Sequence, residues 1–271
     1  MAGGAPMNVA YHLNQLGTDA QLISKVGIGQ LGKELKRFLV SKHIGLEMIQ
    51  TDLKIETGQV LVSIKNEEAN YEIAFPAAWD FISIENEVAK NIASSDLFIY
   101  GSLAARNKTT FNTLRKYLEI APEKAFDINI RPPHYNWQTL DHLLKASDIL
   151  KINEEELDLL ISHYEMTNQE LECSLTELSK EFDISTIICT LGSKGAVLFD
   201  QNNFYTCQAK PIKAMDPVGA CDSFFATFLH FNHLKYAHQK CLELACKMGG
   251  MVADLNGATP SININQVLDE A

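Results

Sequence analysis

The sequence predicts an α/β fold in which a mostly parallel sheet is covered by helices. Short apolar runs of four to six residues alternate with longer segments that place apolar residues at positions i, i+3 and i+4. This alternation is what parallel strands joined by helices produce. The chain also has 271 residues, 46% of them hydrophobic, which is enough for a sizeable core.

The expected elements run in order along the chain. Four times, a short apolar run is followed by a segment of helical period. The run and the segment are residues 20–27 and 31–45, then 95–103 and 108–121, then 124–130 and 137–147, and then 148–153 and 154–164. Residues 185–199 predict a strand, a glycine turn and a second strand. The two segments that follow, 218–234 and 238–255, are mostly helical in pattern.

Residues 51–80 interrupt this alternation. The stretch "TGQVLVSIKNEEANYEIAFPAAWD" alternates apolar and polar residues about the polar turn "KNEEAN", which is typical of a half-buried antiparallel pair of strands. We expect a β hairpin that projects from the main part of the chain. Because open parallel sheets bind ligands outside the ends of their strands, a hairpin beside that edge would be placed to act as a lid.

The composition argues against several classes of function. The net charge is −11, from 23 Lys and Arg against 34 Asp and Glu, which disfavours binding to nucleic acid or to an anionic membrane surface. The six cysteines form no CxxC pair, so free thiols in a reducing compartment are expected. The start of the chain lacks the pattern of a signal peptide, and no apolar stretch reaches the ~18 residues of a membrane span. We therefore expect a cytoplasmic protein with small-molecule partners.

Polar residues end the predicted strand of residues 124–130, at the edge where open parallel sheets bind ligands. Asp127, Asn129 and Arg131 stand together there, and two prolines prevent a helix from starting directly afterwards. The Asn and Arg side chains supply donors for hydroxyl or phosphate oxygens. The alternative interpretation is a loop that contains a salt bridge.

Asn153 and three glutamates, among them Glu156, follow the next predicted strand. The pattern is typical of a helix that Asn153 caps and whose acidic first turn complements the helix dipole. The same acidic cluster would also suit a hydrated Mg²⁺, which takes one or two carboxylates together with substrate phosphates. Both interpretations stay open on the spacing alone.

Two other segments carry glycines at positions that suit close approach of a ligand. Gly192 and Gly195 in "TLGSKG" predict a hairpin turn, and they would also let the backbone approach a phosphate. Gly3 and Gly4 precede an amphipathic segment that carries Asn8, whose amide would suit hydroxyl groups.

The segment "MDPVGACDSFFATF", residues 215–228, carries the strongest indication of chemistry. Gly219, Ala220 and Cys221 are small residues at the start of a predicted helix, where backbone N–H groups can point together at an anion. Asp222 lies in that turn, where the helix dipole favours a carboxylate that is held beside the bound group as a general base. A role as N-cap would explain one aspartate. It does not explain both Asp216 and Asp222, which flank the small residues 219–221.

Taken in order, these segments resemble the PfkB-type, ribokinase-like carbohydrate kinases, and most closely the bacterial fructokinases. "GGAPMNVAYHLNQLG" with "VGIGQLG" resembles the N-terminal signature of the family, and "DPVGACD" resembles the C-terminal signature D-T-x-G-A-G-D. "GSLAAR", "FDINIRPPHY" and "LKINEEEL" resemble fructokinase segments between them. The resemblance runs from Gly3 to about Pro260. It implies a three-layer sandwich, as one domain over residues 1–271 with a β lid at 51–80.

The resemblance also implies the reaction at the C-terminal signature. Asp222 matches the base that takes the proton from a sugar hydroxyl as it attacks the γ-phosphoryl group of ATP. The N–H groups of Gly219, Ala220 and Cys221 would form the anion hole. Phosphoryl transfer needs mainly positioning and charge stabilisation, which such a turn provides.

The other candidate residues match binding positions of the family. The sugar-side positions are Gly3, Gly4, Asn8 and Arg131, with Asp127 and Asn129 in support. Asn153 and Glu156 match the N-x-x-E segment that arranges Mg²⁺, largely through water. The walls of the nucleotide pocket would include Gly192, Gly195 and Gly250. Asp216 resembles a position near which some members bind a monovalent cation such as K⁺.

Three departures from the family pattern bear on activity. The first strand of the family, which carries a G-E-x-L-x-D-type segment, has no counterpart in the sequence, so either another chain or a rearranged sheet is expected to fill its place, or the fold is less stable. Gln30 stands where the family usually has an acid, and Cys221 where it has the second glycine of the anion hole. If that position requires a positive φ, a side chain there costs about 1 kcal/mol or more.

We therefore expect an ATP-dependent kinase that phosphorylates fructose at its 6-hydroxyl, with Mg²⁺ as the counter-charge of the phosphates. The rival interpretation is a catalytically impaired relative that binds sugar or nucleotide without turnover. A third is a kinase for another sugar, a sugar acid or a nucleoside, against which "AAWD" and "NIRPPHY" argue. A homodimer through the lid is also expected, because a hairpin offers free strand edges.

Overall fold

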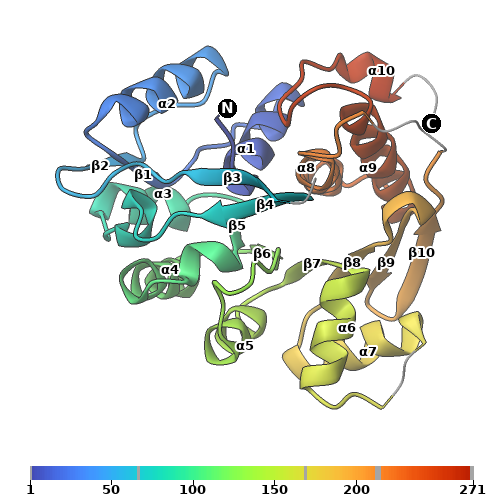
Figure 1. Ribbon diagram of the computed structural model, residues 1–271. Helices are drawn as coiled ribbons and strands as arrows, with labels where there is room; N and C mark the ends of the chain where they lie inside the picture. Colours follow the sequence, from blue (N-terminus) through green and yellow to red (C-terminus); the bar gives the residue numbers. More distant parts are fainter. Residues whose placement is uncertain (1, 66–67, 168–169, 211–214, 269–271) are drawn as a thin grey trace.

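The computed structural model describes residues 2–65, 68–167, 170–210 and 215–268, and its centre is a six-stranded sheet with the order β10-β9-β8-β7-β6-β5 (Figure 1). Four strands, β5 (Phe98–Gly101), β6 (Lys124–Asp127), β7 (Ile149–Asn153) and β8 (Thr186–Thr190), are parallel. β9 (Ala196–Asp200) and β10 (Asn203–Cys207) run antiparallel to their neighbours. The mostly parallel sheet predicted from the sequence is confirmed.

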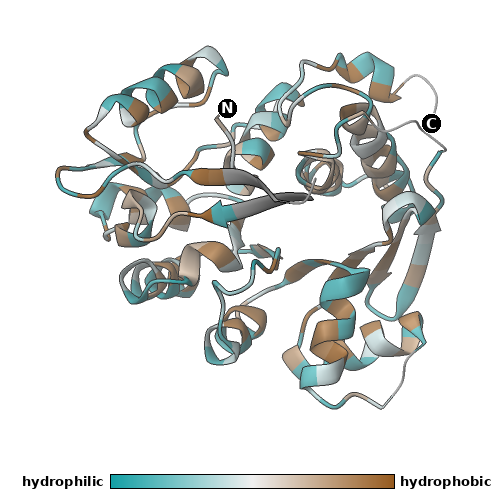
Figure 2. Ribbon diagram, in the orientation of Figure 1, coloured by the Kyte–Doolittle hydropathy of each residue, from teal (hydrophilic) through white to brown (hydrophobic). Residues whose placement is uncertain are grey.

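Helices cover both faces of this sheet. α4 (Lys108–Ile120), α5 (Trp137–Lys145), α6 (Glu154–His163) and α7 (Leu171–Phe182) pack on one face, and α1 (Ala5–Gln15), α8 (Ala220–His233) and α9 (His238–Ala253) pack on the other. Figure 2 shows the hydrophobic colours concentrated on the strands and on the helical sides that face them. Within the described ranges, no helix has the length and apolar character needed to cross a bilayer.

The alternation of side chains along each strand divides the core into two parts. Because successive residues of a strand point to opposite faces, Ala125 and Ile149 join the core beneath α8 and α9. Phe126 and Leu150 join the core against the α4–α7 layer. The same alternation places Asp127 and Lys151, the next odd-numbered positions of β6 and β7, on the α8 face.

Polar N-caps begin the helices that follow these strands. The side chain of Asn107 accepts a hydrogen bond from Thr109 N at the start of α4, and that of Asn136 accepts one from Thr139 N at the start of α5. Each cap satisfies an N–H group that has no partner within the helix. The caps therefore fix where each helix begins relative to the strand end before it.

The segment before β5 forms two small sheets. β1 (Ser24–Gly27) and β2 (Ile49–Asp52) pair in parallel, and α2 (Gln30–Ser41) connects them. β3 (Val60–Lys65) and β4 (Glu68–Ile73) form the antiparallel hairpin that was predicted within residues 51–80. The same range also contains the end of β2 and most of the 3₁₀ helix η1 (Ala78–Phe81).

The β1–β2 pair does not extend the large sheet. β5 ends that sheet, and neither β1 nor β2 pairs with it; α1 contacts β5 instead. The strand predicted near residues 20–27 is therefore present, but it belongs to a separate sheet. The remaining described elements are α3 (Asn86–Ala93), η2 (Ser102–Ala105), η3 (Gly192–Lys194) and α10 (Ile264–Leu268).

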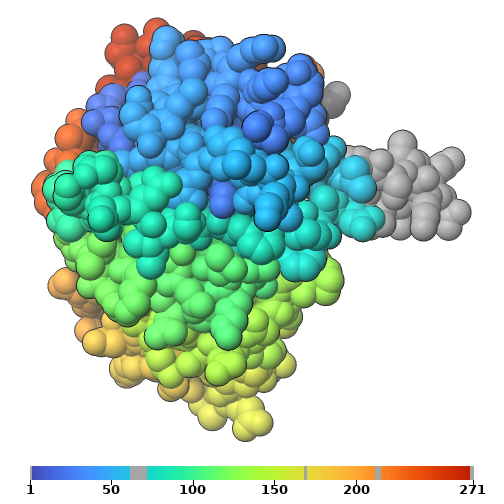
Figure 3. Space-filling view, turned by 90° about the vertical axis from the view of Figure 1, so that its left-hand side faces the viewer, coloured from blue at the N-terminus to red at the C-terminus, as the bar shows by residue number. Residues whose placement is uncertain are grey.

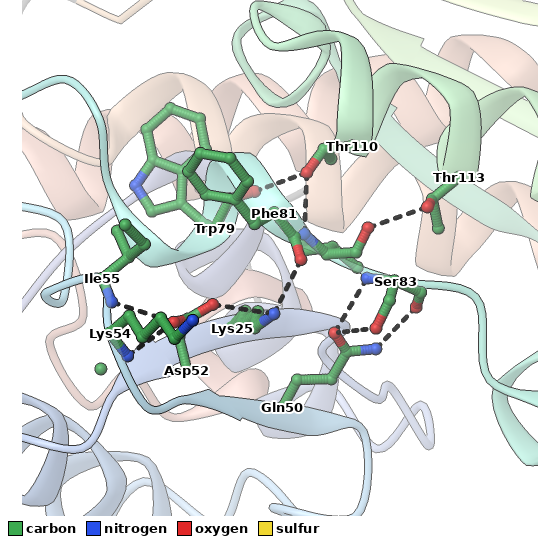
Figure 4. A network of polar contacts seen from close by, with 12 residues as sticks. Lys25, Gln50, Asp52, Lys54, Ile55, Trp79, Phe81, Ser83, Thr110 and Thr113 are labelled. Atoms are coloured by element: carbon green, nitrogen blue, oxygen red, sulfur yellow. Dashed lines mark hydrogen bonds and ion pairs between the residues drawn. The ribbon is translucent and has the colours of Figure 1, made fainter.

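A network of polar contacts holds the β1–β2 sheet to the end of η1 and the segment after it (Figure 4). Lys25 Nζ lies 2.9 Å from Asp52 Oδ2 and donates to the carbonyl of Phe81 at 2.9 Å. Gln50 binds the Ser83 backbone twice, with Nε2 donating to the carbonyl at 2.7 Å and Oε1 accepting from the N–H at 3.0 Å. The small sheet is thereby anchored through both of its strands.

The network continues into α4. Thr110 Oγ1 donates to the carbonyl of Trp79 at 2.8 Å and accepts from Ile82 N at 2.9 Å. Figure 3 views this side of the molecule and shows the blue N-terminal segments lying against the cyan and green segments of α3 and α4. The 3₁₀ helix η1 and the residue that follows it are therefore tied to α4.

Candidate active site

The N-termini of α1 and α8 meet at the carboxyl ends of β6 and β7. Asp222 is buried in the first turn of α8, and Asn8 Nδ2 on α1 donates a hydrogen bond of 2.7 Å to Asp222 Oδ2. Burial raises the pKa of Asp222 to about 6, against the opposing effect of the Asn8 hydrogen bond. A carboxyl group that titrates near neutral pH at the mouth of a helix is suited to act as a general base.

Gly219 gives the turn before α8 its shape. It is the N-cap of α8 with a φ of 85°, and a Cβ on it would lie 2.6 Å from the Cα of Ala258. Cys221 lies inside α8, is exposed, and has no positive φ. The left-handed position of the turn is therefore Gly219, and the backbone strain considered for Cys221 does not arise.

The backbone N–H groups of this turn are placed largely as expected of an anion site. Ala220 N donates to the carbonyl of Pro217 at 3.3 Å, a long bond, while Ser223 N begins the helical pattern by donating to the carbonyl of Gly219 at 2.9 Å. The first N–H groups of a helix have no partner within it. The N–H groups of residues 219–221 therefore stand at the positive end of the α8 dipole.

A buried ion pair lies at the strand ends beneath this turn. Lys151 Nζ on β7 lies 2.8 Å from Asp127 Oδ1 on β6, and both side chains are buried. The other oxygen, Asp127 Oδ2, is buried without a hydrogen-bond partner among the described residues. The salt bridge considered for this segment is therefore present, but it joins Asp127 to Lys151.

Asn153 and Glu156 form a reciprocal capping box at the start of α6. Asn153 Oδ1 accepts from Glu156 N at 2.8 Å, and Glu156 Oε2 accepts from Asn153 N at 3.0 Å. Glu156 Oε1 also accepts from Ile130 N at 2.8 Å, so the same carboxylate holds the loop after β6. Burial raises the pKa of Glu156, whereas Lys151 opposes that rise. The N-cap interpretation of Asn153 is confirmed.

The loop after β6 carries Asn129 and Arg131. Asn129 has a φ of 38°, and its carbonyl accepts from Ser102 Oγ at 3.5 Å. Arg131 is exposed, with Nη1 donating to the carbonyl of Ile130 at 3.2 Å. Its charge acts to lower the pKa of Asp222, so Arg131 belongs to the surroundings of that carboxyl group.

Gly3 and Gly4 are exposed before α1. Gly4 is the N-cap of that helix with a φ of 133°, and open space surrounds the Cβ position of each glycine. Asn8 N donates to the carbonyl of Gly4 at 3.0 Å, and Asn8 Oδ1 is buried without a partner in the described part of the chain. α1 therefore presents two accessible glycines and one unsatisfied amide oxygen close to Asp222.

The carboxylate of Asp216 links two loops by hydrogen bonds. Its Oδ1 accepts from Val218 N at 3.1 Å, and its Oδ2 accepts from Gly257 N at 2.9 Å. Both oxygens therefore hold backbone on either side of the turn at Gly219. The structure places Asp216 at the entrance of that turn, as the sequence order suggested, and not in contact with Asp222.

The predicted nucleotide-side glycines lie on other elements. Gly192 and Gly195 have φ values of 58° and 113° in the turn between β8 and β9, where Leu191 N donates to the carbonyl of Gly195 at 2.8 Å. Gly250 lies in α9 with open space at its Cβ position, whereas a Cβ on Gly249 would lie 3.2 Å from the Ala220 carbonyl oxygen. The hydrogen bonds of the described residues do not link these glycines to Asp222.

Sequence reasoning missed two residues that shape the site. Lys151 is the partner of Asp127; its signal was a lysine inside the otherwise apolar run "DILKIN". His12 is fully buried, its pKa is lowered to about 4 by burial, and its Nε2 lies 2.9 Å from the carbonyl of Ala258. Because Asn8 and His12 are four residues apart on one helix, α1 contacts both Asp222 and the loop behind Gly219.

The donor set fits a metal ion that arrives with phosphates. Among the residues that the structure describes, no group of three or more His, Cys, Asp or Glu side chains forms a metal cage. Both Glu156 oxygens already accept backbone N–H groups, and each carboxylate oxygen retains a second lone pair. This arrangement suits Mg²⁺, which keeps several waters and binds through few carboxylates and substrate phosphates.

Comparisons with known proteins cover almost the whole chain. The model of the pfkB family carbohydrate kinases matches residues 1–265. A fructokinase of Salmonella typhimurium is 23% identical over an alignment of 273 positions that covers 97% of this chain and 83% of that protein.

Solved structures agree on the fold. A fructokinase double mutant from Vibrio cholerae O395, in a fructose-, ADP- and potassium-bound form, superposes with a TM-score of 0.81 at 23% identity, over 98% of this chain and 89% of that one. The 2-dehydro-3-deoxygluconokinase of Thermotoga maritima superposes with a TM-score of 0.85 at 19% identity, over 98% and 88%. The fold is thus ribokinase-like, and the chain belongs to the pfkB family of carbohydrate kinases, phosphotransferases that act on an alcohol group.

Proposed function

We propose that this kinase transfers the γ-phosphoryl group of ATP to the 6-hydroxyl of fructose. The observation that carries the proposal is the placement of Asp222, a buried carboxyl group with a pKa of about 6 in the first turn of α8, held by Asn8. A base with this pKa is ionised at neutral pH and can still accept a proton from an attacking hydroxyl. The fructokinase of Salmonella typhimurium supports fructose as the acceptor.

The proposed reaction gives each of these groups a role. The 6-hydroxyl oxygen forms a bond to the γ-phosphorus, the bond from that phosphorus to the β–γ bridging oxygen breaks, and the hydroxyl proton passes to the Asp222 carboxylate. The N–H groups of Gly219, Ala220 and Cys221 would stabilise the charge on the transferred group. ADP leaves with the electron pair of the broken bond.

Unsatisfied acceptors near Asp222 suit a polyhydroxyl substrate. Asn8 Oδ1 and Asp127 Oδ2 are buried without partners among the described residues, and buried acceptors of this kind are normally paired. Sugar hydroxyls are donors that would satisfy both. We assign Gly3, Gly4, Asn129 and Arg131 to the same sugar side, where the two glycines leave space for the ligand.

We propose the nucleotide-binding side of the site from residues that lie at the ends of strands. Asn153 and Glu156 would hold hydrated Mg²⁺, which when bound neutralises phosphate charge. Gly192, Gly195 and Gly250 would line the nucleotide pocket. The potassium-bound fructokinase structure from Vibrio cholerae supports a K⁺ site near Asp216, where the carboxylate already organises the loop backbone.

The direct test is the variant Asp222→Asn in a coupled assay of ADP release with fructose and ATP. Losing the base should lower kcat by about 10²–10⁴-fold, while calorimetry still detects binding of fructose. Asp141→Asn is the matched control, because Asp141 pairs with Lys145 on the surface of α5. Equal turnover in Asp222→Asn and wild type would exclude Asp222 as the base.

The rival proposal is a relative that binds sugar or nucleotide without turnover. Its support is the exposed thiol of Cys221 in the turn that would hold the phosphoryl group. The variant Cys221→Gly discriminates, because a thiol that crowds the phosphoryl group would depress kcat, and the smaller residue would then raise it. An unchanged kcat would remove crowding by Cys221 from consideration.

A further inference from the structure

The turn at Gly219 lies against the loop that follows α9. Residues 254–263 of this loop form neither helix nor strand. A Cβ on Gly219 would lie 2.6 Å from both the Cα and the carbonyl oxygen of Ala258, so Ala258 packs directly against the turn. The neighbouring Gly257 N donates to Asp216 Oδ2 at 2.9 Å. The position of the loop therefore sets the shape of the turn that begins α8.

Side chains of α1 hold this loop by hydrogen bonds. His12 Nε2 lies 2.9 Å from the carbonyl oxygen of Ala258, and the Tyr11 hydroxyl donates to the carbonyl of Pro260 at 3.1 Å. Two further bonds continue the series, from Lys42 Nζ to the carbonyl of Thr259 at 2.9 Å and from Ile262 N to Gln15 Oε1 at 3.2 Å. The bond of His12 is the one that reaches the residue in contact with Gly219.

Packing alone does not explain a histidine at position 12. The side chain is fully buried, and because a carbonyl oxygen can only accept, Nε2 carries the ring proton and donates it to Ala258. Burial lowers the pKa of His12 to about 4, so the ring stays neutral at neutral pH. Nδ1 is then an acceptor that is buried without a partner in the described part of the chain. A leucine would fill the space without that cost, so the donor to Ala258 is what the histidine adds.

The same helix also binds the proposed base. Asn8 Nδ2 donates to Asp222 Oδ2 at 2.7 Å, and Asn8 lies one turn before His12. Residues four apart in a helix lie on one face. α1 therefore contacts the carboxyl group through Asn8 and the loop behind the anion-binding turn through His12, and one helix sets the distance between them.

We propose that His12 is a positioning residue for phosphoryl transfer: through Ala258 it holds the turn of residues 219–221, so that the N–H groups of the turn keep a fixed distance from Asp222. The inference rests on the proposed function of this turn and of Asp222. His12 acts through Ala258 and not on the reacting atoms. Because phosphoryl transfer depends mainly on positioning, a displacement of about 1 Å can lower its rate about 10²-fold.

The variants His12→Leu and His12→Gln test this role together. Leucine fills the buried space but cannot donate, so kcat with fructose and ATP should fall about 10–100-fold, with a smaller change in the KM for fructose. The glutamine Nε2 lies as many bonds from the backbone as the histidine Nε2, so His12→Gln should recover most of kcat. Equal kcat in the two variants, whether low or at the wild-type level, would contradict the role of His12.

The matched control is Tyr11→Phe. This variant removes one hydrogen bond from the neighbouring residue of α1 to the same loop, at Pro260, and keeps the buried ring. Because Pro260 is not the residue that touches Gly219, kcat should stay at the wild-type level. A fall in kcat as large as that of His12→Leu would overturn the inference, since any weakening of the loop would then have the same effect.

Hydrogen exchange, measured by mass spectrometry on peptides that cover residues 216–223, provides a readout that needs no turnover. Ser223 N donates to the carbonyl of Gly219 at 2.9 Å, so its protection reports the order of the turn. Exchange should be faster in His12→Leu and close to wild type in His12→Gln and Tyr11→Phe. A wild type without turnover on fructose would contradict the proposed function, whereas unchanged exchange in His12→Leu would contradict the role of His12.

Discussion

At the scale of single residues, the site depends on how burial and local charge oppose each other at Asp222. Burial in the first turn of α8 disfavours the ionised carboxyl, and the hydrogen bond from Asn8 favours it. The result is a group that changes charge near neutral pH. A pH dependence of turnover is the direct consequence.

The first prediction is the acid limb of that dependence. Because the pKa of Asp222 is raised to about 6, the base is protonated below that pH and cannot accept the sugar proton. We expect kcat/KM to fall about tenfold per unit below pH 6. Initial rates measured from pH 5 to 8 would show it, and a flat profile down to pH 5 would contradict an essential carboxyl with this pKa.

The second prediction concerns the turn residue Gly219. The variant Gly219→Ala combines a positive φ with a Cβ only 2.6 Å from Ala258 Cα, so its free energy of unfolding should fall by more than the ~1–3 kcal/mol typical of backbone strain alone. Gly17→Ala is the control, because Gly17 has a φ of 94° with nothing within 4 Å of the added Cβ. Denaturant unfolding compares the two. Equal losses would show that crowding by Ala258 adds nothing.

At the scale of elements, the alternation of apolar runs and helical segments was enough to predict β5 to β8 and the helices α4, α5 and α6 between them, but not α7, because the periods of 2 and 3.6 residues are local properties. The hairpin β3–β4 was predictable for the same reason. The sheet to which β1 belongs was not, since strand pairing is decided by contacts that are distant in sequence.

In the site too, some features follow from the local sequence, whereas others depend on contacts between segments that are distant in sequence. Asp222, Asn153 and Gly219 carry local signals of helix starts, and the structure places each of them at one. The pairing of Lys151 with Asp127 depends on the register between β6 and β7. Of the adjacent glycines in α9, the rotation of the helix turns Gly249 toward α8 and leaves Gly250 facing open space, which the sequence alone does not decide.

The third prediction uses that pair of glycines. Gly249→Ala places a Cβ 3.2 Å from the Ala220 carbonyl oxygen and 3.4 Å from Phe224 Cβ, so it should shift the first turn of α8 and lower kcat. Gly250→Ala adds a Cβ in open space within a helix and should stabilise the fold by up to about 1 kcal/mol. If Gly250 also lines the nucleotide pocket, KM for ATP should rise. An unchanged KM in Gly250→Ala would remove Gly250 from that wall.

At the scale of the whole molecule, the sheet brings together segments from both ends of the chain. Asn8 and Asp222 are 214 residues apart in sequence and are joined by one hydrogen bond. The β1–β2 sheet is tied to η1 and α4 by the network of Figure 4. We propose that residues 1–271 act as one domain in which the hairpin within 51–80 closes over the sugar and offers an edge for a homodimer.

The central claim is the transfer of phosphate from ATP to fructose, and a panel of acceptors tests it most directly. ADP release would be measured with fructose, mannose, ribose, a sugar acid and a nucleoside, for the wild type and for Asp222→Asn. We predict the highest kcat/KM with fructose, and its loss in Asp222→Asn. Higher kcat/KM with another acceptor, or no turnover on any of them while calorimetry still detects sugar or ATP binding, would contradict the claim.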